Sequence, residues 1–176
     1  MPRPPTPDAD RTFPGRSSAN GFNGIDGETG FDSPIIGDAY SYWFSLCAGR
    51  PFPLRSEVDP IAMPRHLLPR VVLVDIIDRE KPDFRWRLVG TYTTALMGRD
   101  ATGRIWSELY SPEDFRNVSE GPRHIISTGK PFRSVVRAPL REREFMMIEA
   151  IDLPLSSDGR EIDMVLGFHD SMTGYL

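Results

Sequence analysis

The chain has 176 residues, a formal net charge of −4 at pH 7 and 39% hydrophobic residues, a length that suits one domain with a tail. The acidic balance argues against a nucleic-acid partner, because phosphate binding depends on a concentrated excess of Lys and Arg. The first residues, MPRPPTPDAD, contain no apolar stretch, and no uninterrupted apolar run approaches the length of a membrane span. We therefore expect a cytoplasmic protein that binds neither nucleic acid nor membrane.

Residues 1–34 differ in composition from the rest of the chain. Pro, Gly, Ser, Asn and Asp dominate them, and large apolar side chains are few. Such a segment cannot bury enough surface to offset its conformational entropy. The composition predicts a disordered tail over 1–34, an N-terminal helical cap with its connector over 35–70, and a core domain over 71–176.

The segment AYSYWFSLCA (39–48) has apolar side chains spaced three and four apart, which predicts an amphipathic helix. Asp38 is the expected N-cap, and Gly49 should end the helix. This aromatic face is too large to stay exposed, so it should cover either the outer face of a sheet or a partner chain. The candidate interface residues are Tyr40, Trp43 and Phe44.

Five runs in the core domain have the character of β-strands. They are VVLVDII (71–77), FRWRLVG (84–90), PFRSVVRAP (131–139), EREFMMIEAIDLPL (142–155) and DMVLGFHD (163–170). The fourth run is apolar on both of its faces, which is typical of a central strand covered on both sides. The sequence predicts an α+β fold, a five-stranded antiparallel sheet with short helices on one face and the N-terminal helix on the other face or on a partner chain.

The segment between the second and third runs reads as helical. TYTTALMG (91–98) predicts a short helix that ends at Gly98. Ser111 followed by Pro112 marks the start of a longer helix, because serine is a preferred cap and proline suits the first helical position. Gly121 and Pro122 should kink or break this helix.

The motifs RWRLVGT, MGRDATG, SPEDF and ISTGKPF, followed by antiparallel strands, resemble those of a PAS domain. LCAGRPFPLRSEVDP and FRWRLVGTYTTALMGRD are similar to PAS_5, a family of small and often stand-alone bacterial PAS proteins. The resemblance covers about residues 38–170. It implies a sensory or protein-interaction module in signalling, without an established common ligand.

The resemblance also implies where a ligand would bind, between the sheet and the connecting helix. The candidate pocket residues are Trp86, Leu88, Leu96, Trp106, Phe115, His124, Ile125, Met147 and Phe168. The alternative is that these side chains fill an ordinary core, since apolar residues at these periods usually do so.

We expect no cofactor, although the sequence leaves open whether an unidentified small ligand binds. His124 lies on the connecting helix, from which haem-binding PAS domains present an axial histidine, but a lone histidine is usually structural and we do not expect haem. His66 and His169 have no metal-ligand spacing, so no metal site is predicted.

No nucleophile elbow, phosphate-binding loop or metal-binding helix is present in the sequence. The resemblance therefore implies a non-enzymatic sensory or regulatory module in bacterial signal transduction. Its expected partners are a second copy of the chain and a signalling protein such as a sensor kinase. A purely structural interaction module is a further reading that the sequence does not separate from a sensor.

The alternative function is a small isomerase-like or hydrolase-like enzyme with a buried carboxylate base. Glu149 and Asp75 are the candidate bases, because both are acids in or near apolar strands. Glu149 would serve if it pointed toward the helices, but we expect it to meet an arginine or to sit at a wet edge.

Overall fold

The computed structural model describes residues 18–20, 30–137 and 146–172. Its centre is an antiparallel sheet with the strand order β1-β4-β5-β6-β2-β3. The strands are β1 (Ser18–Asn20), β2 (Val71–Asp78), β3 (Asp83–Val89), β4 (Phe132–Arg137), β5 (Met147–Leu155) and β6 (Met164–Met172). Strands β2 to β6 confirm the predicted five-stranded antiparallel sheet, and β1 adds a short strand beside β4.

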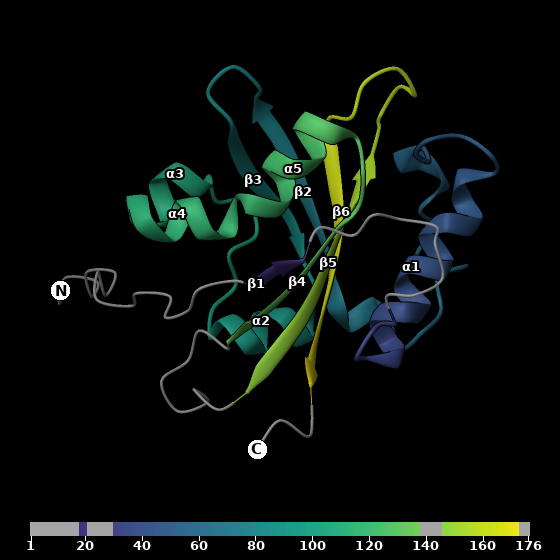
Figure 1. The fold of residues 1–176 in the computed structure, drawn as a ribbon, viewed down its shortest axis with the longest axis horizontal. Helices are drawn as coiled ribbons and strands as arrows, with labels where there is room; N and C mark the ends of the chain where they lie inside the picture. The colour runs from purple at the N-terminus through teal and green to yellow at the C-terminus, as the bar shows by residue number, and fades with distance from the viewer. Residues whose placement is uncertain (1–17, 21–29, 138–145, 173–176) are drawn as a thin grey trace, which may run out of the picture.

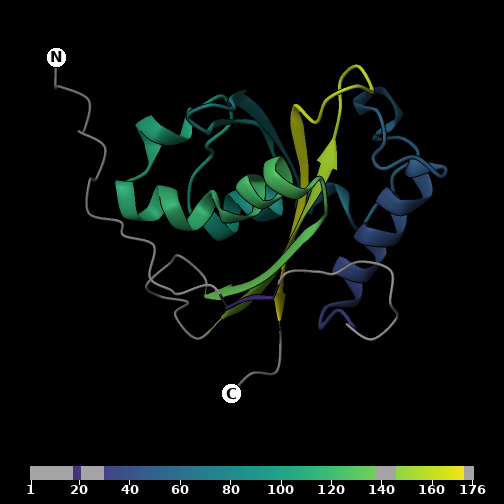
Figure 2. The same cartoon turned by 45° about the horizontal axis from the view of Figure 1, so that its top comes forward.

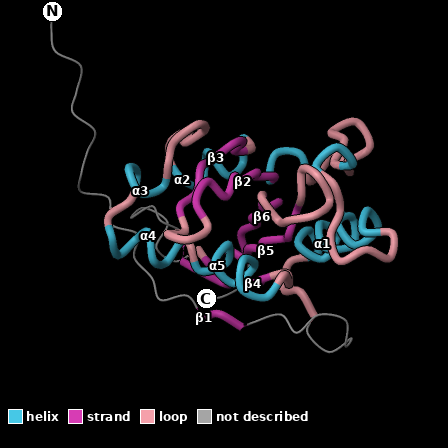
Figure 3. Tube along the Cα trace, turned by 90° about the horizontal axis from the view of Figure 1, so that it is seen from above, coloured by secondary structure: helices cyan, strands magenta, loops and turns pink. Residues whose placement is uncertain are grey.

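Helices cover both faces of this sheet. They are α1 (Pro34–Cys47), α2 (Thr91–Met97), α3 (Trp106–Leu109), α4 (Pro112–Val118) and α5 (Glu120–Thr128). Helices α2 to α5 lie on one side of the sheet and α1 lies on the other (Figures 1 and 2). The view from above shows the strands between these two layers (Figure 3). None of the described helices is both long and apolar enough to cross a membrane.

Helix α1 begins earlier than the sequence suggested. Ser33 is the N-cap, its hydroxyl accepts hydrogen bonds from the N–H groups of Ile35 and Ile36, and Pro34 fills the first helical position. The prediction that Asp38 caps the helix was wrong, since Asp38 lies inside it and pairs with His66 at 2.9 Å.

Two parts of the predicted disordered segment 1–34 have a place in the fold. Residues 18–20 pair with β4, and Ser33 is buried at the start of α1. Residues 18–20 and Ser33 therefore contact the folded domain, although the composition placed them in a disordered tail. The other residues before Gly30 lie outside the described part of the chain.

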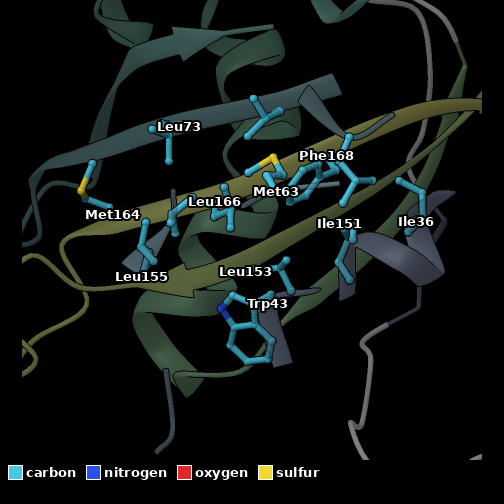
Figure 4. Close-up of a cluster of buried hydrophobic side chains, with 14 of the residues drawn as sticks. Ile36, Trp43, Met63, Leu73, Ile151, Leu153, Leu155, Met164, Leu166 and Phe168 are labelled. Carbon is cyan, nitrogen blue, oxygen red and sulfur yellow. The ribbon is translucent and has the colours of Figure 1, made fainter. Parts of the chain in front are cut away.

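One face of α1 packs on the sheet. Trp43 is 4% exposed and its indole Nε1–H donates a 2.9 Å hydrogen bond to the carbonyl oxygen of Pro154. Figure 4 shows Trp43 beside Leu153 in this cluster. Of the two predicted roles for this helix, the structure shows the first, that it covers the outer face of the sheet. Trp43 was predicted to take part in an interface with a partner chain. It faces the sheet instead, so it is not available to such a partner.

A fully buried carboxylate anchors the start of α1 to β5. Glu149 accepts hydrogen bonds from the backbone N–H groups of Ser33, at 2.5 Å, and Asp32, at 3.3 Å. The guanidinium of Arg133 on β4 pairs with Glu149 and also with Asp32. Glu149 thus meets an arginine, as expected, on the face of the sheet that α1 covers.

Strand β6 supplies a second anchor to the same place. The hydroxyl of Ser33 donates to Asp170 at 2.7 Å, and Asp170 also accepts a 2.9 Å hydrogen bond from the Nε–H of Arg70. Both anchoring carboxylates are therefore paired with an arginine and with the helix start. Such pairing offsets the cost of burying their charges.

Strand β3 carries a bulge that changes which side chains share a face. Leu73 pairs with Leu88, whereas Val74 pairs with Trp86, so Arg87 is an extra residue in β3. Leu88 consequently lies on the α1 side, 40% exposed, and not beside Trp86 as the simple alternation predicted. The backbone of Trp86 exchanges hydrogen bonds with Gly103 and Arg104 along the outer edge of β3.

Trp43→Ala should lower the free energy of unfolding by about 3–5 kcal/mol, because it empties a buried aromatic site and removes a hydrogen bond. Urea denaturation measures this loss. The neighbouring variant Phe44→Ala is the matched control, since Phe44 is 53% exposed, and we expect a change below about 1 kcal/mol. Similar losses in the two variants would contradict the described orientation of α1.

Candidate functional site

A cavity of about 160 Å³ lies between the sheet and helices α2 to α5. Residues of strands β2 to β6 line it on one side and residues of helices α2 to α5 line it on the other. An engineered apolar cavity of roughly 150 Å³ in another protein holds benzene. The space therefore suits a compact molecule built on one small ring.

Three aromatic side chains form one wall of the cavity. The ring centroids of Trp86 and Trp106 are 4.7 Å apart, and Tyr110 meets Trp106 edge-on at 6.0 Å. The indole Nε1–H of Trp86 donates to the hydroxyl of Tyr110 at 3.1 Å. Burial raises the pKa of Tyr110 to about 12, so its hydroxyl keeps its proton at pH 7.

Asp152 on β5 brings a carboxyl group into the cavity. Gly121 on α5 and Gly167 on β6 flank it, and a Cβ atom at position 167 would lie 3.1 Å from its Oδ1. A side chain at position 121 would collide with the same carboxyl. Asp152 is partly buried, and the loss of water around its carboxylate raises its pKa to about 7.

His169 on β6 lies diagonally across from Asp152 on the same face of the sheet, since Asp152 pairs with Gly167 and Ala150 pairs with His169. Its Nδ1 is 3.4 Å from the hydroxyl of Thr93, which donates to the carbonyl oxygen of Arg70. The tautomer with a proton on Nδ1 fits this arrangement and leaves Nε2 as an acceptor. Burial lowers the pKa of His169 to about 4, so the ring is neutral at pH 7.

The charged groups of the cavity are acidic. Glu120 on α5 and Asp152 contribute carboxyl groups, and no lysine or arginine among the described residues lines the space. His169 adds no charge at pH 7, because its pKa is depressed. The cavity is therefore poorly suited to an organic anion and open to a neutral or cationic molecule.

The structure brings together three of the predicted pocket residues, Trp86, Leu96 and Trp106. Phe115 and Ile125 belong to the core beneath the helices and do not line the cavity. His124 is outside the lining as well, and its ring packs against Phe132 at 5.2 Å.

Met147 and Phe168 were assigned to the wrong face. Phe168 pairs with Ile151 and Val71 and is buried in the cluster under α1. Met147 shares this face of β5, because it is two residues from Glu149 and four from Ile151. Both faces of β5 are apolar, so the pattern alone does not tell which one borders the cavity.

Sequence reasoning missed Asp152, His169, Tyr110 and the glycines that flank Asp152. The alternation of β5 contained a signal, because Asp152 is two residues beyond Ala150 and four beyond Ile148, on an otherwise apolar face. A polar residue in such a position indicates either a paired group or a binding site.

Neither candidate base of the enzymatic alternative reaches the cavity. Glu149 holds the start of α1, and Asp75 pairs with Arg85 at 2.8 Å and with Arg87 at 3.3 Å. Both acids point to the α1 side of the sheet. The described residues also contain no group of three or more His, Cys, Asp or Glu side chains placed to hold a metal ion.

Asp152→Asn should flatten the dependence of stability on pH. Between about pH 4 and pH 7 the folded chain keeps a proton on Asp152 that the unfolded chain releases, so wild-type stability falls as the pH rises through this window. We expect the wild type to lose on the order of 1–3 kcal/mol more than the variant between pH 4.5 and 7.5. The lowered pKa of His169 makes stability rise with pH over this range. This contribution is the same in the wild type and in the variant, so it cancels when the two profiles are subtracted. Urea titrations measure the free energy of unfolding of both proteins at each pH. If the two profiles of this free energy against pH are parallel, the raised pKa of Asp152 is contradicted.

Comparisons with curated proteins and with solved structures give no match. Among protein families, PAS_5, described as a PAS domain, matches residues 32–169. This range includes α1, the five main strands up to His169, and all the elements that line the cavity. PAS domains are generally non-enzymatic sensory modules. The match covers most of the chain and agrees with the order of its strands and helices, so the protein belongs to the PAS_5 family of PAS domains.

Proposed function

We propose that the protein is a non-enzymatic, cytoplasmic sensory module that binds a small molecule in the cavity and acts on a signalling partner, such as a sensor kinase, in bacterial signal transduction. One observation carries this proposal, the uncompensated carboxyl group of Asp152 at the wall of a ring-sized space. Binding sites typically combine a mostly apolar cavity with a few polar groups that fix the orientation of the ligand.

The contrast with the other face of the sheet supports a binding role. Glu149, Asp170 and Asp75 are acids in buried positions there, and each is paired with at least one arginine. Asp152 has no such partner among the described residues. A filled structural core normally satisfies its polar groups, whereas a ligand site leaves some of them for the ligand.

The two strands that border the cavity also hold the N-terminal helix. On β5, Asp152 faces the cavity and Glu149 anchors α1. On β6, His169 faces the cavity and the next residue, Asp170, anchors α1. A ligand would act on α1 through these strands, by as much as it binds one packing of the helix more tightly than another. Output would then pass to the partner through α1.

A carboxyl group with a pKa near 7 can also act as a general base. This property favours the enzymatic alternative, with Asp152 as the base instead of Glu149 or Asp75. The two functions differ in the fate of the bound molecule. A sensor releases its ligand chemically unchanged, and mass spectrometry of the recovered ligand measures this. Recovery of an altered molecule would support the enzyme.

Intrinsic fluorescence offers a direct test of binding in the cavity. The chain has three tryptophans, of which Trp86 and Trp106 line the cavity, while Trp43 lies under α1. In a Trp43→Phe background, titration with benzyl alcohol should change the emission with a saturable profile. Ala150→Phe, which fills the cavity from β5, should abolish the change.

Ser134→Leu, from the neighbouring strand β4, is a second filling variant for the case that Ala150→Phe does not fold. Circular dichroism and urea titration establish which variant is folded. A titration profile that stays the same in a folded, filled variant would contradict binding in this space. A Trp43→Phe protein with an unfilled cavity that shows no saturable change would contradict the proposed site.

We also propose that the protein forms a homodimer through the outer surface of α1. Phe44 is 53% exposed and stacks on Tyr40 with a centroid distance of 6.1 Å, so this surface is aromatic. Phe44→Ser should lower the mass measured by light scattering at a given concentration. Ile61→Ser is the control, because Ile61 is 93% exposed outside α1. An unchanged mass for Phe44→Ser would refute this interface.

A further inference from the structure

We infer that the ligand of this cavity is a small organic cation, an ammonium group on a compact apolar or aromatic body. The inference rests on the proposed function, because it assigns a chemical class to the same site. It follows from three features of the lining: its aromatic wall, the sign of its charged groups and the acceptor atoms of Asp152 and His169.

The aromatic wall favours a cation. Trp86, Trp106 and Tyr110 contact one another around one end of the cavity. The faces of aromatic rings attract ammonium groups, most strongly for tryptophan and when water is excluded. An apolar ligand body would bury its surface against the same rings, so the wall serves both halves of such a molecule.

The charges of the lining point in the same direction. The titratable groups around Asp152 are Glu120 from α5, His169 from β6 and Tyr110 after α3, and none of them carries a positive charge at pH 7. A bound anion would lack a counter-charge among the described lining residues. A bound cation would instead gain Asp152 as its counter-ion, in a charge-assisted hydrogen bond.

Two polar side chains of the lining, Asp152 and His169, offer acceptors beside each other on the same face of the sheet, whereas Asn117, Ser134 and the indole of Trp106 carry donors. Ionised Asp152 offers two oxygens, and neutral His169 offers Nε2, because its Nδ1 is engaged with Thr93. An ammonium group has three N–H donors and no acceptor. Gly121 and Gly167 keep the space at the carboxyl open, since a side chain at either position would crowd Asp152.

Calorimetric titration of the full-length protein with three ring-sized probes tests the inference. Benzylamine is a cation, benzyl alcohol is its neutral counterpart, and benzoate is an anion of similar size. At pH 8 we expect benzylamine to bind at least about tenfold more tightly than benzyl alcohol, and benzoate to give no measurable binding.

The pH dependence gives a second readout without any mutation. Asp152 must be ionised to pair with the ammonium, and its pKa is about 7. The affinity for benzylamine should therefore fall by about tenfold from pH 8 to pH 6, with proton release at the lower pH. Titrations in buffers of different ionisation enthalpy count these protons. The affinity for benzyl alcohol should not fall in this way.

Asp152→Asn identifies the counter-ion. The variant should bind benzylamine no more tightly than benzyl alcohol, whereas Asp38→Asn, a change at an exposed carboxylate on α1, should keep the wild-type preference. A benzylamine preference that persists in Asp152→Asn would overturn the assignment. Wild-type protein that binds benzyl alcohol as tightly as benzylamine would overturn the cationic class and leave the proposed cavity site standing. A wild type that binds none of the three probes would overturn both.

Discussion

The structure depends on the fact that the central strands are apolar on both faces. Strand β5 buries Ile151 and Leu153 on one side and Ile148 and Ala150 on the other. A sheet of this kind exposes a large apolar surface unless each face is covered. Helix α1 covers one face and α2 to α5 cover the other, so the two-layer cover follows from the composition of one strand.

Two carboxyl groups on this strand show how differently the faces are used. Glu149 and Asp152 are three residues apart and therefore point in opposite directions. Glu149 is saturated by Arg133 and by the N–H groups at the start of α1, and it fixes the helix on the sheet. Asp152 lies between two glycines, and no arginine or lysine among the described residues pairs with it. The first face is structural, and the second has the properties of a binding surface.

The fold could be predicted largely from the sequence, because strand periodicity and capping residues are local signals. The helix start at Ser111 and the helix end at Gly98 follow from such signals. The site could be predicted in part. Trp86, Leu96 and Trp106 are among the residues that the family resemblance placed at a ligand, but the face that borders the cavity on β5 depends on tertiary packing. The bulge at Arg87, which moves Leu88 to the opposite face, is likewise a property of strand pairing and not of β3 alone.

Of the five main strands, the two outer ones, β4 and β3, each have a short backbone neighbour from the same chain. Residues 18–20 pair with β4, and the segment from Gly103 to Ile105 bonds to β3 around Trp86. Unpaired outer strands attract foreign strands and promote aggregation. Because the chain occupies these positions itself, an incoming strand cannot pair with residues 133–135 of β4 or with the backbone of Trp86 unless it displaces these segments. A strand that paired there would therefore have to compete with a segment that is part of the same chain and is always present at high local concentration.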